Sequence, residues 1–447
     1  MKSKKAIAAL FLVAMLLGMI SCISPGVVLV STSASALPQF SASPTPAAAP
    51  TVQPSGGAHV TAVVTPFPEP RYVSLLFAGD VMAHKKQIDC HRFGAMYDFT
   101  DDYIYIQEII SAADIAVVNL ETPMAGEGPY AGYPHFNAPD SLADALLYAG
   151  VDVIATANNH ALDQGIGGAI RTCSFLRNAG FEVAGTDSGE GGTKYALVER
   201  NGIRIGFVNF TNSLNDGYPE EAMPYVNCLH DADGTERGYQ ALEGEISALK
   251  ALGADFIVVY MHWGNEYQLQ ANETQEAMAK TIADMGADLI IGSHPHVLQN
   301  VAEYTSPVTG KTVLIYYSLG NLVSNQPYGY GPGRGNCETG ALALIRLARL
   351  GTGSVGIDAA GYLTTYVLKP DVVHEYVVDG QIQSRSTRAY YIVPSAAALA
   401  DPASYIGAEG ACLDHIGQSI ENGRELLGQP GGDLAHFNFR EYDAFEW

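Results

Sequence analysis

Short apolar runs alternate with amphipathic segments over much of the chain, from residue 72 to about residue 320. Runs rich in Val, Ile, Leu and Phe predict buried strands, and the amphipathic segments between them predict helices. Each predicted helix is followed within two residues by a glycine, as is common at helix C-termini. Strands that alternate with helices predict a layered α/β fold. The predicted strands are Tyr72–Ala78, Ile115–Leu120, Val153–Ala157, Ile203–Phe210, Phe256–Met261, Leu289–Ile291 and Val313–Tyr317, and the predicted helices are Asp140–Ala149, Gly167–Ala179, Glu243–Ala251 and Gln275–Met285.

The pattern changes in the last quarter of the chain, where strands follow one another without helices between them. They predict an antiparallel meander that completes a second sheet. Beyond about residue 395 the sequence is rich in Ala, Gly and Asp, which predicts a loosely packed C-terminal appendage, residues 396–447. The folded domain is therefore expected to span residues 71–395. The strands of the meander are Gly340–Leu347, Gly361–Leu368, Val372–Val378 and Arg388–Ile392.

The N-terminus, residues 1–30, has the pattern of a secretory signal or membrane anchor. Lysines at positions 2, 4 and 5 precede the apolar run Ala6–Ile20. Three endings stay open: cleavage at Ala34-Ser35-Ala36, acylation of Cys22 at a loose lipobox, or no cleavage and a single membrane anchor. All three place most of the chain outside the cytoplasm, secreted or tethered to the membrane. Residues 31–70 are rich in Ser, Thr, Ala and Pro and predict an extended linker.

Composition narrows the classes of function. The chain has 447 residues, of which 47% are hydrophobic, so it can bury a sizeable core. Its formal net charge of −23 argues against binding nucleic acid through a basic surface, and a solvated acidic exterior explains that charge most simply. The five cysteines after Cys22 include no Cys-x-x-Cys pair. They allow one or two disulfides but imply no disulfide framework.

Polar residues suited to chemistry follow six of the predicted strands. In open α/β folds, ligands bind at the carboxyl ends of strands, so these residues are expected to lie close together. His294 and His296 flank a proline that stiffens the turn after their strand, and imidazole is a common metal ligand. The six clusters are Gly79-Asp80-Val81-Met82, Asn119-Leu120-Glu121, Thr156 to His160 with Asp163, Met261 to Glu266, Gly292 to Val297 and Tyr317 to Asn321.

Each cluster also has an ordinary structural interpretation. Asp80 suits a turn, Glu121 suits a solvent-facing position, and His160 or His262 suits simple packing. Taken together, however, two carboxylates, an amide and several histidines form a mixed nitrogen and oxygen donor set. Such sets bind Zn, Mn or Fe and leave room for a dinuclear centre. The sequence therefore predicts a divalent metal site.

The motifs resemble those of the CapA family of capsule or poly-γ-glutamate biosynthesis proteins, within the calcineurin-like metallophosphatase superfamily. The resemblance covers roughly Tyr72 to Leu347. It implies a metallophosphatase-like four-layer α/β/β/α sandwich with two mixed sheets and a site at the strand ends. Besides the strand-end clusters named above, the resemblance rests on Phe136-Asn137-Ala138-Pro139 and on Ala161-Leu162-Asp163.

The same resemblance implies a role for each site residue. Asp80 and His296 are expected to bind a first metal and Glu121 to bridge two metals, while Asn159, His262 and His294 bind the second. His160 is expected to protonate the leaving group or steady transition-state charge, with Asp163 orienting its ring. The sequence departs from the superfamily at Met82, where the phosphatases usually have a histidine, and at Glu121, where they have an aspartate. A thioether is a poor ligand for oxygen-loving metals, which predicts a weakly held or absent first metal.

Two features bear on the substrate. Arg334 lies in the glycine-rich loop Gly331–Gly335, where it is placed either to grip a carboxylate or phosphate or simply to face solvent. Asn137, in the motif shared with the family, is a second candidate substrate-binding residue. The ring side chains of Tyr130, Tyr133, His135 and Phe136 are expected to line a cleft.

Three functions remain open from the sequence. The first is an extracytoplasmic, membrane-tethered protein that helps make, export or anchor an anionic polymer such as poly-γ-glutamate, with a metal offering the polymer carboxylates a binding point. The second is a metal-dependent hydrolase of a phosphoester or an amide. The third is a non-catalytic scaffold subunit of a membrane synthase or export complex. No nucleic-acid partner is expected.

Overall fold

The apolar runs assemble into two mixed sheets in a computed structural model, which describes residues 69–126, 128–189, 191–215, 219–230, 237–326, 336–351, 353–378, 380–428 and 434–443. The larger sheet has the order β18-β15-β14-β1-β4-β5-β6, with β13 beside β1 and β19 beside β15. The smaller sheet has the order β11-β12-β10-β9-β8-β7. The larger sheet contains β1 (Arg71–Val81), β4 (Ile115–Leu120), β5 (Val153–Ala155), β6 (Glu182–Ala184), β13 (Asn321–Val323), β14 (Thr339–Arg349), β15 (Val355–Leu368), β18 (Tyr391–Pro394) and β19 (Phe439–Glu441), and the smaller contains β7 (Tyr195–Arg200), β8 (Ile203–Thr211), β9 (Phe256–His262), β10 (Leu289–Ser293), β11 (Val301–Thr305) and β12 (Thr312–Tyr316).

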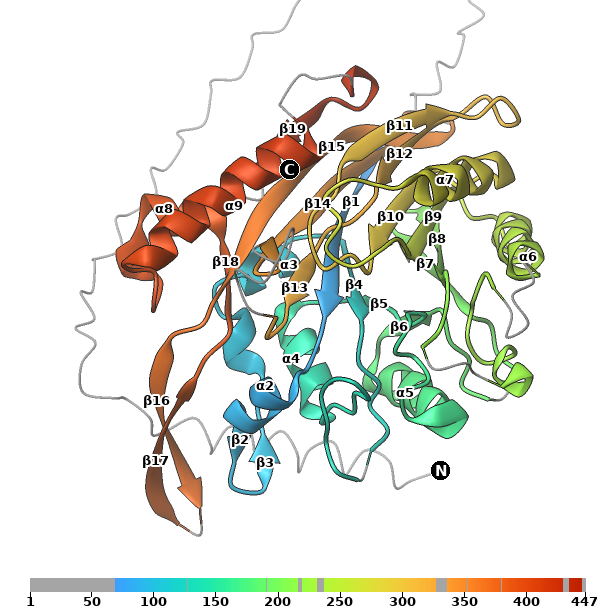
Figure 1. Ribbon diagram of the computed structural model, residues 1–447. Helices are drawn as coiled ribbons and strands as arrows, with labels where there is room; N and C mark the ends of the chain where they lie inside the picture. The colour runs from blue at the N-terminus through green and yellow to red at the C-terminus, as the bar shows by residue number, and fades with distance from the viewer. Residues whose placement is uncertain are drawn as a thin grey trace, which may run out of the picture. The chain divides into compact units, whose positions relative to one another are not determined.

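Helices cover the outer faces of both sheets (Figure 1). The outer face of the larger sheet carries α2 (Lys85–Cys90), α3 (Gln107–Ser111), α4 (Ser141–Ala149) and α5 (Gly165–Ala179), and that of the smaller sheet carries α6 (Gly238–Ala251) and α7 (Glu273–Met285). Short 3-10 turns connect several elements: η1 (Thr100–Tyr103), η2 (Glu220–Ala222), η4 (Pro402–Ser404) and η5 (Ala435–Phe437).

Both sheets are buried on both faces, which explains their continuous apolar strands. Alternate residues of a strand point to opposite sides. In β1, Leu75 and Phe77 enter the core between the two sheets, whereas Leu76 and Ala78 enter the core under the helices. The predicted four-layer α/β/β/α sandwich with two mixed sheets is confirmed.

The late strands differ from the predicted second sheet. Strand β14 pairs antiparallel with β1, and β15 pairs antiparallel with β14, so both extend the sheet that β1 begins. Only β16 (Asp371–Val378) and β17 (Gln381–Arg388) leave it, as a separate hairpin that projects at the lower left of Figure 1. Alternate apolar side chains of β14 pack into the cores on the two faces of the sheet, which favours a central position in this sheet over a place in a new one.

The C-terminal segment is packed more closely than its composition predicts. Helices α8 (Ser395–Ala400) and α9 (Ala411–Leu427) lie along β15 and β18, and β19 pairs in parallel with β15. Leu427 and Phe439 join the core between the sheets. Within the described residues, this segment therefore belongs to the fold rather than hanging loosely from it. Its boundary at residue 395 stays a prediction.

The predicted signal or anchor, residues 1–30, lies outside the described residues, as does the linker 31–70 except for its last two positions. Among the helices that the structure describes, none combines the length and apolar character needed to span a bilayer.

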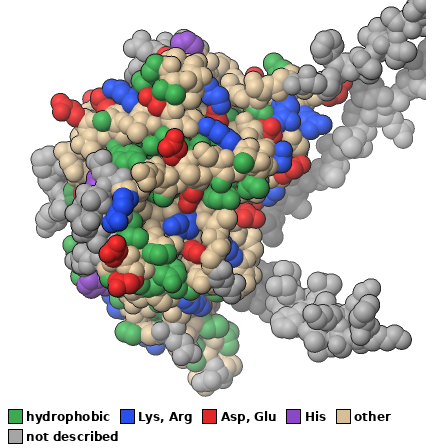
Figure 2. All heavy atoms as spheres, turned by 90° about the vertical axis from the view of Figure 1, so that its right-hand side faces the viewer, with side chains coloured by type: hydrophobic (Ala, Val, Ile, Leu, Met, Phe, Trp, Pro, Cys, Tyr) green, Lys and Arg blue, Asp and Glu red, His purple; other side chains and the backbone are tan. Residues whose placement is uncertain are grey.

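Charged side chains of both signs are interspersed on the face that carries α6 and α7, which Figure 2 shows. This mixture fits the interpretation of the net charge of −23 as a solvated exterior rather than one concentrated acidic field.

Candidate metal centre

The strand ends of the two sheets meet at one place. Strands β1, β4 and β5 run parallel in the larger sheet, and β9 and β10 run parallel in the smaller one. Their carboxyl ends therefore lie at one edge of each sheet. The contacts cross from sheet to sheet: the backbone N–H of His294 donates to Asp80 Oδ2 at 3.3 Å, and Asn159 Oδ1 lies 2.8 Å from His262 Nε2. All six predicted metal ligands belong to this one cluster.

The turn after β10 is held in an unusual backbone conformation. His294 has φ +98° and His296 has φ +58°, in the left-handed region that non-glycine residues seldom adopt. Just before the turn, a Cβ atom on Gly292 would lie 2.0 Å from the carbonyl oxygen of Tyr317, so only glycine fits there. Such strain persists where surrounding packing enforces it, and here it brings both imidazoles to the same cluster.

His262 is the centre of one group of donor atoms. Its Nδ1 lies 3.0 Å from Ser293 Oγ, whose hydroxyl in turn donates to a main-chain carbonyl oxygen. Asn119 Nδ2 lies 3.3 Å from the same Nδ1, and in the tautomer whose Nδ1 donates to Ser293, Nε2 presents a lone pair. That Nε2 lies 2.8 Å from Asn159 Oδ1, 3.1 Å from His294 Nδ1 and 3.4 Å from Glu121 Oε1. Lone pairs so close together favour a cation between them.

His296 is the centre of a second group. Its Nδ1 lies 3.1 Å from Asp80 Oδ2 and 3.8 Å from Glu121 Oε2. Glu121 thus stands between the two groups, with one carboxylate oxygen toward each. This is the position expected of a bridging ligand.

The Glu121 carboxylate is the clearest indication of a missing partner. The residue has no exposed surface, and neither oxygen has a hydrogen-bond partner among the described residues. Burial, reinforced by the charge of Asp80, raises the pKa of Glu121 well above its ordinary value. A buried acceptor left without a partner is costly, so the residues fit a bound cation.

The pKa values of the other ligands follow from burial and mutual charge. Burial lowers the pKa of His262 to about 3, and burial and neighbouring histidines lower that of His294 well below its ordinary value. Burial opposes protonation of His296 as well, but Glu121 and Asp80 raise its pKa to about 9. Burial likewise would raise the pKa of Asp80, yet His296 lowers it overall. His262 and His294 are thus neutral at pH 7, and each has a nitrogen lone pair to offer a metal.

His160 and Asp163 form a buried pair beside the centre. Nδ1 of His160 lies 2.7 Å from Asp163 Oδ2, and the same oxygen accepts the backbone N–H of Phe136 at 2.7 Å. The Phe136 ring packs edge-on against the imidazole at 4.7 Å. Asp163 therefore holds the ring through Nδ1, and Nε2 lies 3.5 Å from Asn215 Nδ2; the catalytic roles of both residues stay predictions. Tyr133, which is 72% exposed, lies 6.4 Å from the same imidazole between ring centroids.

The two predicted substrate residues have different outcomes. Arg334 lies outside the described residues. Asn137 is buried, and its Oδ1 accepts the backbone N–H of Ala125 while its Nδ2 donates weakly to the Pro129 carbonyl. Its carboxamide thus holds the loop that carries Phe136, and a contact with substrate stays a prediction.

Two amides at the centre were missing from the predicted ligands. Asn119 Nδ2 donates to Asp80 Oδ1 at 2.7 Å and orients that carboxylate. Asn321 Oδ1 lies 3.1 Å from His296 Nδ1. Both residues lie within motifs already noted: the strand-end rule would have found Asn119, near the carboxyl end of β4, whereas Asn321 is the first residue of β13 and reaches the centre through the pairing of β13 with β1.

Two further residues lie in loops, where the sequence gives no comparable signal. Asn215 Nδ2 lies 3.4 Å from Nδ1 of His160. The ring of His84 packs edge-on against the ring of Phe136, with 5.3 Å between their centroids, and Phe136 in turn contacts His160. Burial lowers the pKa of His84 to about 4, so it is neutral at pH 7.

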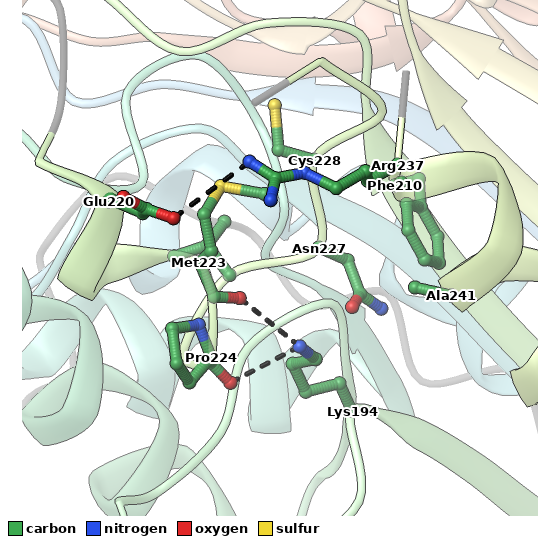
Figure 3. A pocket seen from close by; sticks show the side chains of 11 residues that line it. Lys194, Phe210, Glu220, Met223, Pro224, Asn227, Cys228, Arg237 and Ala241 are labelled. Atoms are coloured by element: carbon green, nitrogen blue, oxygen red, sulfur yellow. Dashed lines mark hydrogen bonds and ion pairs between the residues drawn. The ribbon is translucent and has the colours of Figure 1, made fainter. Parts of the chain in front are cut away.

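A separate cavity of about 420 Å³ lies at the start of α6, away from the centre (Figure 3). None of the predicted site residues lines it. Its half-buried cation, Lys194, donates to the carbonyl oxygens of Met223 and Pro224, and Arg237 lies 3.9 Å from Glu220. Both cations thus contact neighbouring residues of this region.

The chain is similar to proteins of capsule synthesis. A sequence model of the family described as "Bacterial capsule synthesis protein PGA_cap" matches residues 74–326. The capsule biosynthesis protein CapA of Bacillus anthracis is 30% identical over 266 residues, which cover 57% of this chain and 60% of that protein. The PGA biosynthesis protein CapA of Bacillus subtilis (strain 168) is 30% identical over 254 residues, 56% of this chain and 62% of that protein. The chain thus matches about three fifths of the length of these relatives.

A solved structure of Haemophilus influenzae NAD nucleotidase (NadN) aligns with 84% of this chain and 58% of its own, at 10% identity and a TM-score of 0.41. A likeness of this degree supports no conclusion about function.

Proposed function

The chain belongs to the bacterial capsule synthesis protein family PGA_cap, and from this membership we propose that it takes part in the biosynthesis of an anionic capsule polymer of the poly-γ-glutamate type. The N-terminal pattern of lysines and apolar residues supports action outside the cytoplasm, with attachment to the membrane or secretion. The named relatives in two Bacillus species support the class of polymer.

The proposal includes a centre for two divalent cations at the strand ends. The observation that carries it is the Glu121 carboxylate, which is fully buried and lacks any hydrogen-bond partner within the described residues. Two triads of potential ligands share this residue: one with Asp80 and His262, the other with His294 and His296. Asn159 adds an oxygen 2.8 Å from His262 Nε2. Mn, Zn and Fe all suit such a mixed donor set.

A cation at this centre also bears on how an acidic protein holds an acidic polymer. The formal net charge of −23 repels a polyanion at long range. Within a Debye length, about 8 Å at physiological ionic strength, local charges dominate. Divalent cations would give the polymer carboxylates a local binding point.

Hydrolysis of an amide or phosphoester bond is a second candidate function. The His160–Asp163 pair favours it, because an imidazole fixed at Nδ1 presents Nε2 to a leaving group. A bound divalent metal supplies a Lewis acid and activates water. The chain's own part is to hold the bond to be cleaved near His160, to orient that ring through Asp163 and to deliver a proton from Nε2 to the leaving atom.

Metal analysis of the full chain tests the proposal. The purified wild-type protein is expected to contain divalent metal by plasma mass spectrometry, and a His294→Ala/His296→Ala variant is expected to lose it. His436→Ala, whose side chain is 67% exposed, is the matched control and is expected to retain the metal. A wild-type protein that contains no metal and takes up none would overturn the metal centre.

Turnover separates the two candidate functions. Both proteins are assayed on γ-linked polyglutamate and on a generic phosphodiester, with and without added Mn²⁺. Turnover that the double variant abolishes supports the hydrolase. Metal-dependent binding of polyglutamate without turnover supports a polymer-handling role, and metal-free binding supports the scaffold interpretation.

A further inference from the structure

A second strand end lies directly beside Asp80. Strand β13 pairs in parallel with β1, and the register places Asn321 opposite Asp80. The backbones approach so closely that a Cβ atom on Gly79 would lie 1.8 Å from the carbonyl oxygen of Gly320. Asn321 is fully buried, so its side chain is held at the same edge of the sheet as the Asp80 carboxylate.

The carboxamide of Asn321 has one orientation that satisfies its surroundings. Its Nδ2 lies 2.9 Å from the carbonyl oxygen of Cys337 and 2.8 Å from Gln326 Oε1. A main-chain carbonyl only accepts hydrogen bonds, so the amide nitrogen must face it. The amide oxygen therefore points the other way, and Oδ1 lies 3.1 Å from Nδ1 of His296.

Three side-chain oxygens converge on that one nitrogen. Asp80 Oδ2 and Asn321 Oδ1 each lie 3.1 Å from His296 Nδ1, and Glu121 Oε2 lies 3.8 Å from it. Nδ1 carries at most one hydrogen, so it can donate to only one of the three. Atoms bound to one metal at about 2.0–2.2 Å lie roughly 3 Å from each other. A cation among these four atoms would satisfy all of them at once.

We infer that Asn321 Oδ1 is a ligand of the first cation. It completes a set formed with Asp80, Glu121 and His296. The inference rests on the proposed metal centre and changes one expectation about it. Met82 offers only a thioether, which predicts a weakly held first metal, but the paired strand supplies an oxygen ligand instead.

The donor sets of the two positions differ as a result. The first position has three oxygens and one imidazole nitrogen, whereas the second has two oxygens and two imidazole nitrogens. Oxygen donors suit Mn²⁺, and imidazole suits Zn²⁺. The first position is therefore expected to be the better Mn²⁺ site of the two.

Calorimetric titration of the full chain with Mn²⁺ tests the inference without relying on activity. The wild-type protein is expected to bind two ions. His294→Ala is expected to keep only the ion of the first position, and adding Asn321→Ala is expected to weaken that remaining event about 10- to 100-fold. Asn325→Ala, in the same loop, is the matched control, because its side chain accepts from Tyr390 and does not contact the centre.

A second variant guards against a folding defect in Asn321→Ala, judged by circular dichroism. Gln326→Ala removes one acceptor that orients the Asn321 amide, so it is expected to weaken the first event and leave the second unchanged. The inference is wrong if either variant, Asn321→Ala or Gln326→Ala, is folded and yet has a Kd for Mn²⁺ at the first position within about threefold of that of the protein into which it was introduced. A wild-type protein that binds no Mn²⁺ would instead overturn the metal centre, and the inference with it.

Discussion

Replacing Glu121 by glutamine is expected to stabilise the metal-free protein. The change keeps the shape of the side chain and removes its charge. Leaving a buried polar group without a partner costs about 1–3 kcal/mol, and more for a charged one. Glu121 has two such oxygens, and its Oε1 lies 3.4 Å from His262 Nε2. A glutamine amide can donate to that nitrogen, so Glu121→Gln is expected to gain about 1–3 kcal/mol in the free energy of unfolding.

Metal is expected to reverse the order of stability. A ligand that binds only the folded state adds about 2.7 kcal/mol at a concentration 100 times its Kd. The wild-type protein should gain this amount with Mn²⁺, because in the proposed centre both positions would share its carboxylate. The glutamine variant should gain little, since a neutral amide replaces the shared anionic ligand. Glu121 thus lowers the stability of the metal-free fold in favour of metal binding, as functional residues often do.

Urea unfolding followed by circular dichroism measures both effects, in EDTA and in saturating Mn²⁺. Glu199→Gln, at an exposed position of β7, is the control and is expected to change stability by less than about 0.5 kcal/mol. Two results would refute the reasoning. One is a glutamine variant less stable than wild type in EDTA, which would mean that the carboxylate has structural partners. The other is equal stabilisation of both proteins by Mn²⁺.

Three further changes are expected to act at separate points. Burial raises the pKa of Glu245 to about 7 from its ordinary 4.5, so between these pH values the folded state keeps a proton that the unfolded state has released. The free energy of unfolding should therefore fall by about 3 kcal/mol as the pH rises through this interval. Urea unfolding at pH 5 and pH 8 should show this loss in wild type and not in Glu245→Gln. If the chain turns over one of the two substrates, as the hydrolase candidate requires, Asp163→Asn should lower kcat about 100-fold by freeing the ring of His160, with metal content unchanged; an unchanged kcat would remove the pair from the chemistry. Gly292→Ala should lose about 1–3 kcal/mol in urea unfolding because its Cβ meets a carbonyl oxygen, whereas Gly244→Ala, in open space on α6, should lose nothing.

The elements that the sequence predicts best are those whose signal is local. Strand β4 matches its predicted bounds, Ile115–Leu120, because every residue of a strand buried on both faces is apolar or at the site. The turn with His294 and His296 is a weak signal on its own, and the other strand-end clusters are what turn it into the prediction of a composite site. Convergence of the six predicted ligands follows from one topological rule about parallel strands.

Pairing between distant segments is where local patterns give too little information. Strand β13 has only three residues, and its register with β1 joins Asp80 to Asn321 across most of the domain. Helix α9 was missed for another reason. Its Gly and Asp residues suggest a loose segment, yet Ile416, Ile420 and Leu427 lie on one face and are buried. The spacing of these apolar residues is typical of an amphipathic helix, but the overall composition of the segment obscured it.

The charge at the strand ends bears on which function the fold serves. With His296 neutral and both carboxylates ionised, as metal binding would require, Asp80 and Glu121 contribute a formal charge of about −2 and two divalent cations about +4, so the loaded centre would be positive. Attraction to a polycarboxylate would then depend on metal and weaken with salt, even if no bond is cleaved. Apolar or hydrogen-bonded contacts with the exposed side chain of Tyr133 would depend on neither. Polyglutamate binding measured against Mn²⁺ and ionic strength therefore separates a metal-centred polymer site from a surface that has kept only the fold.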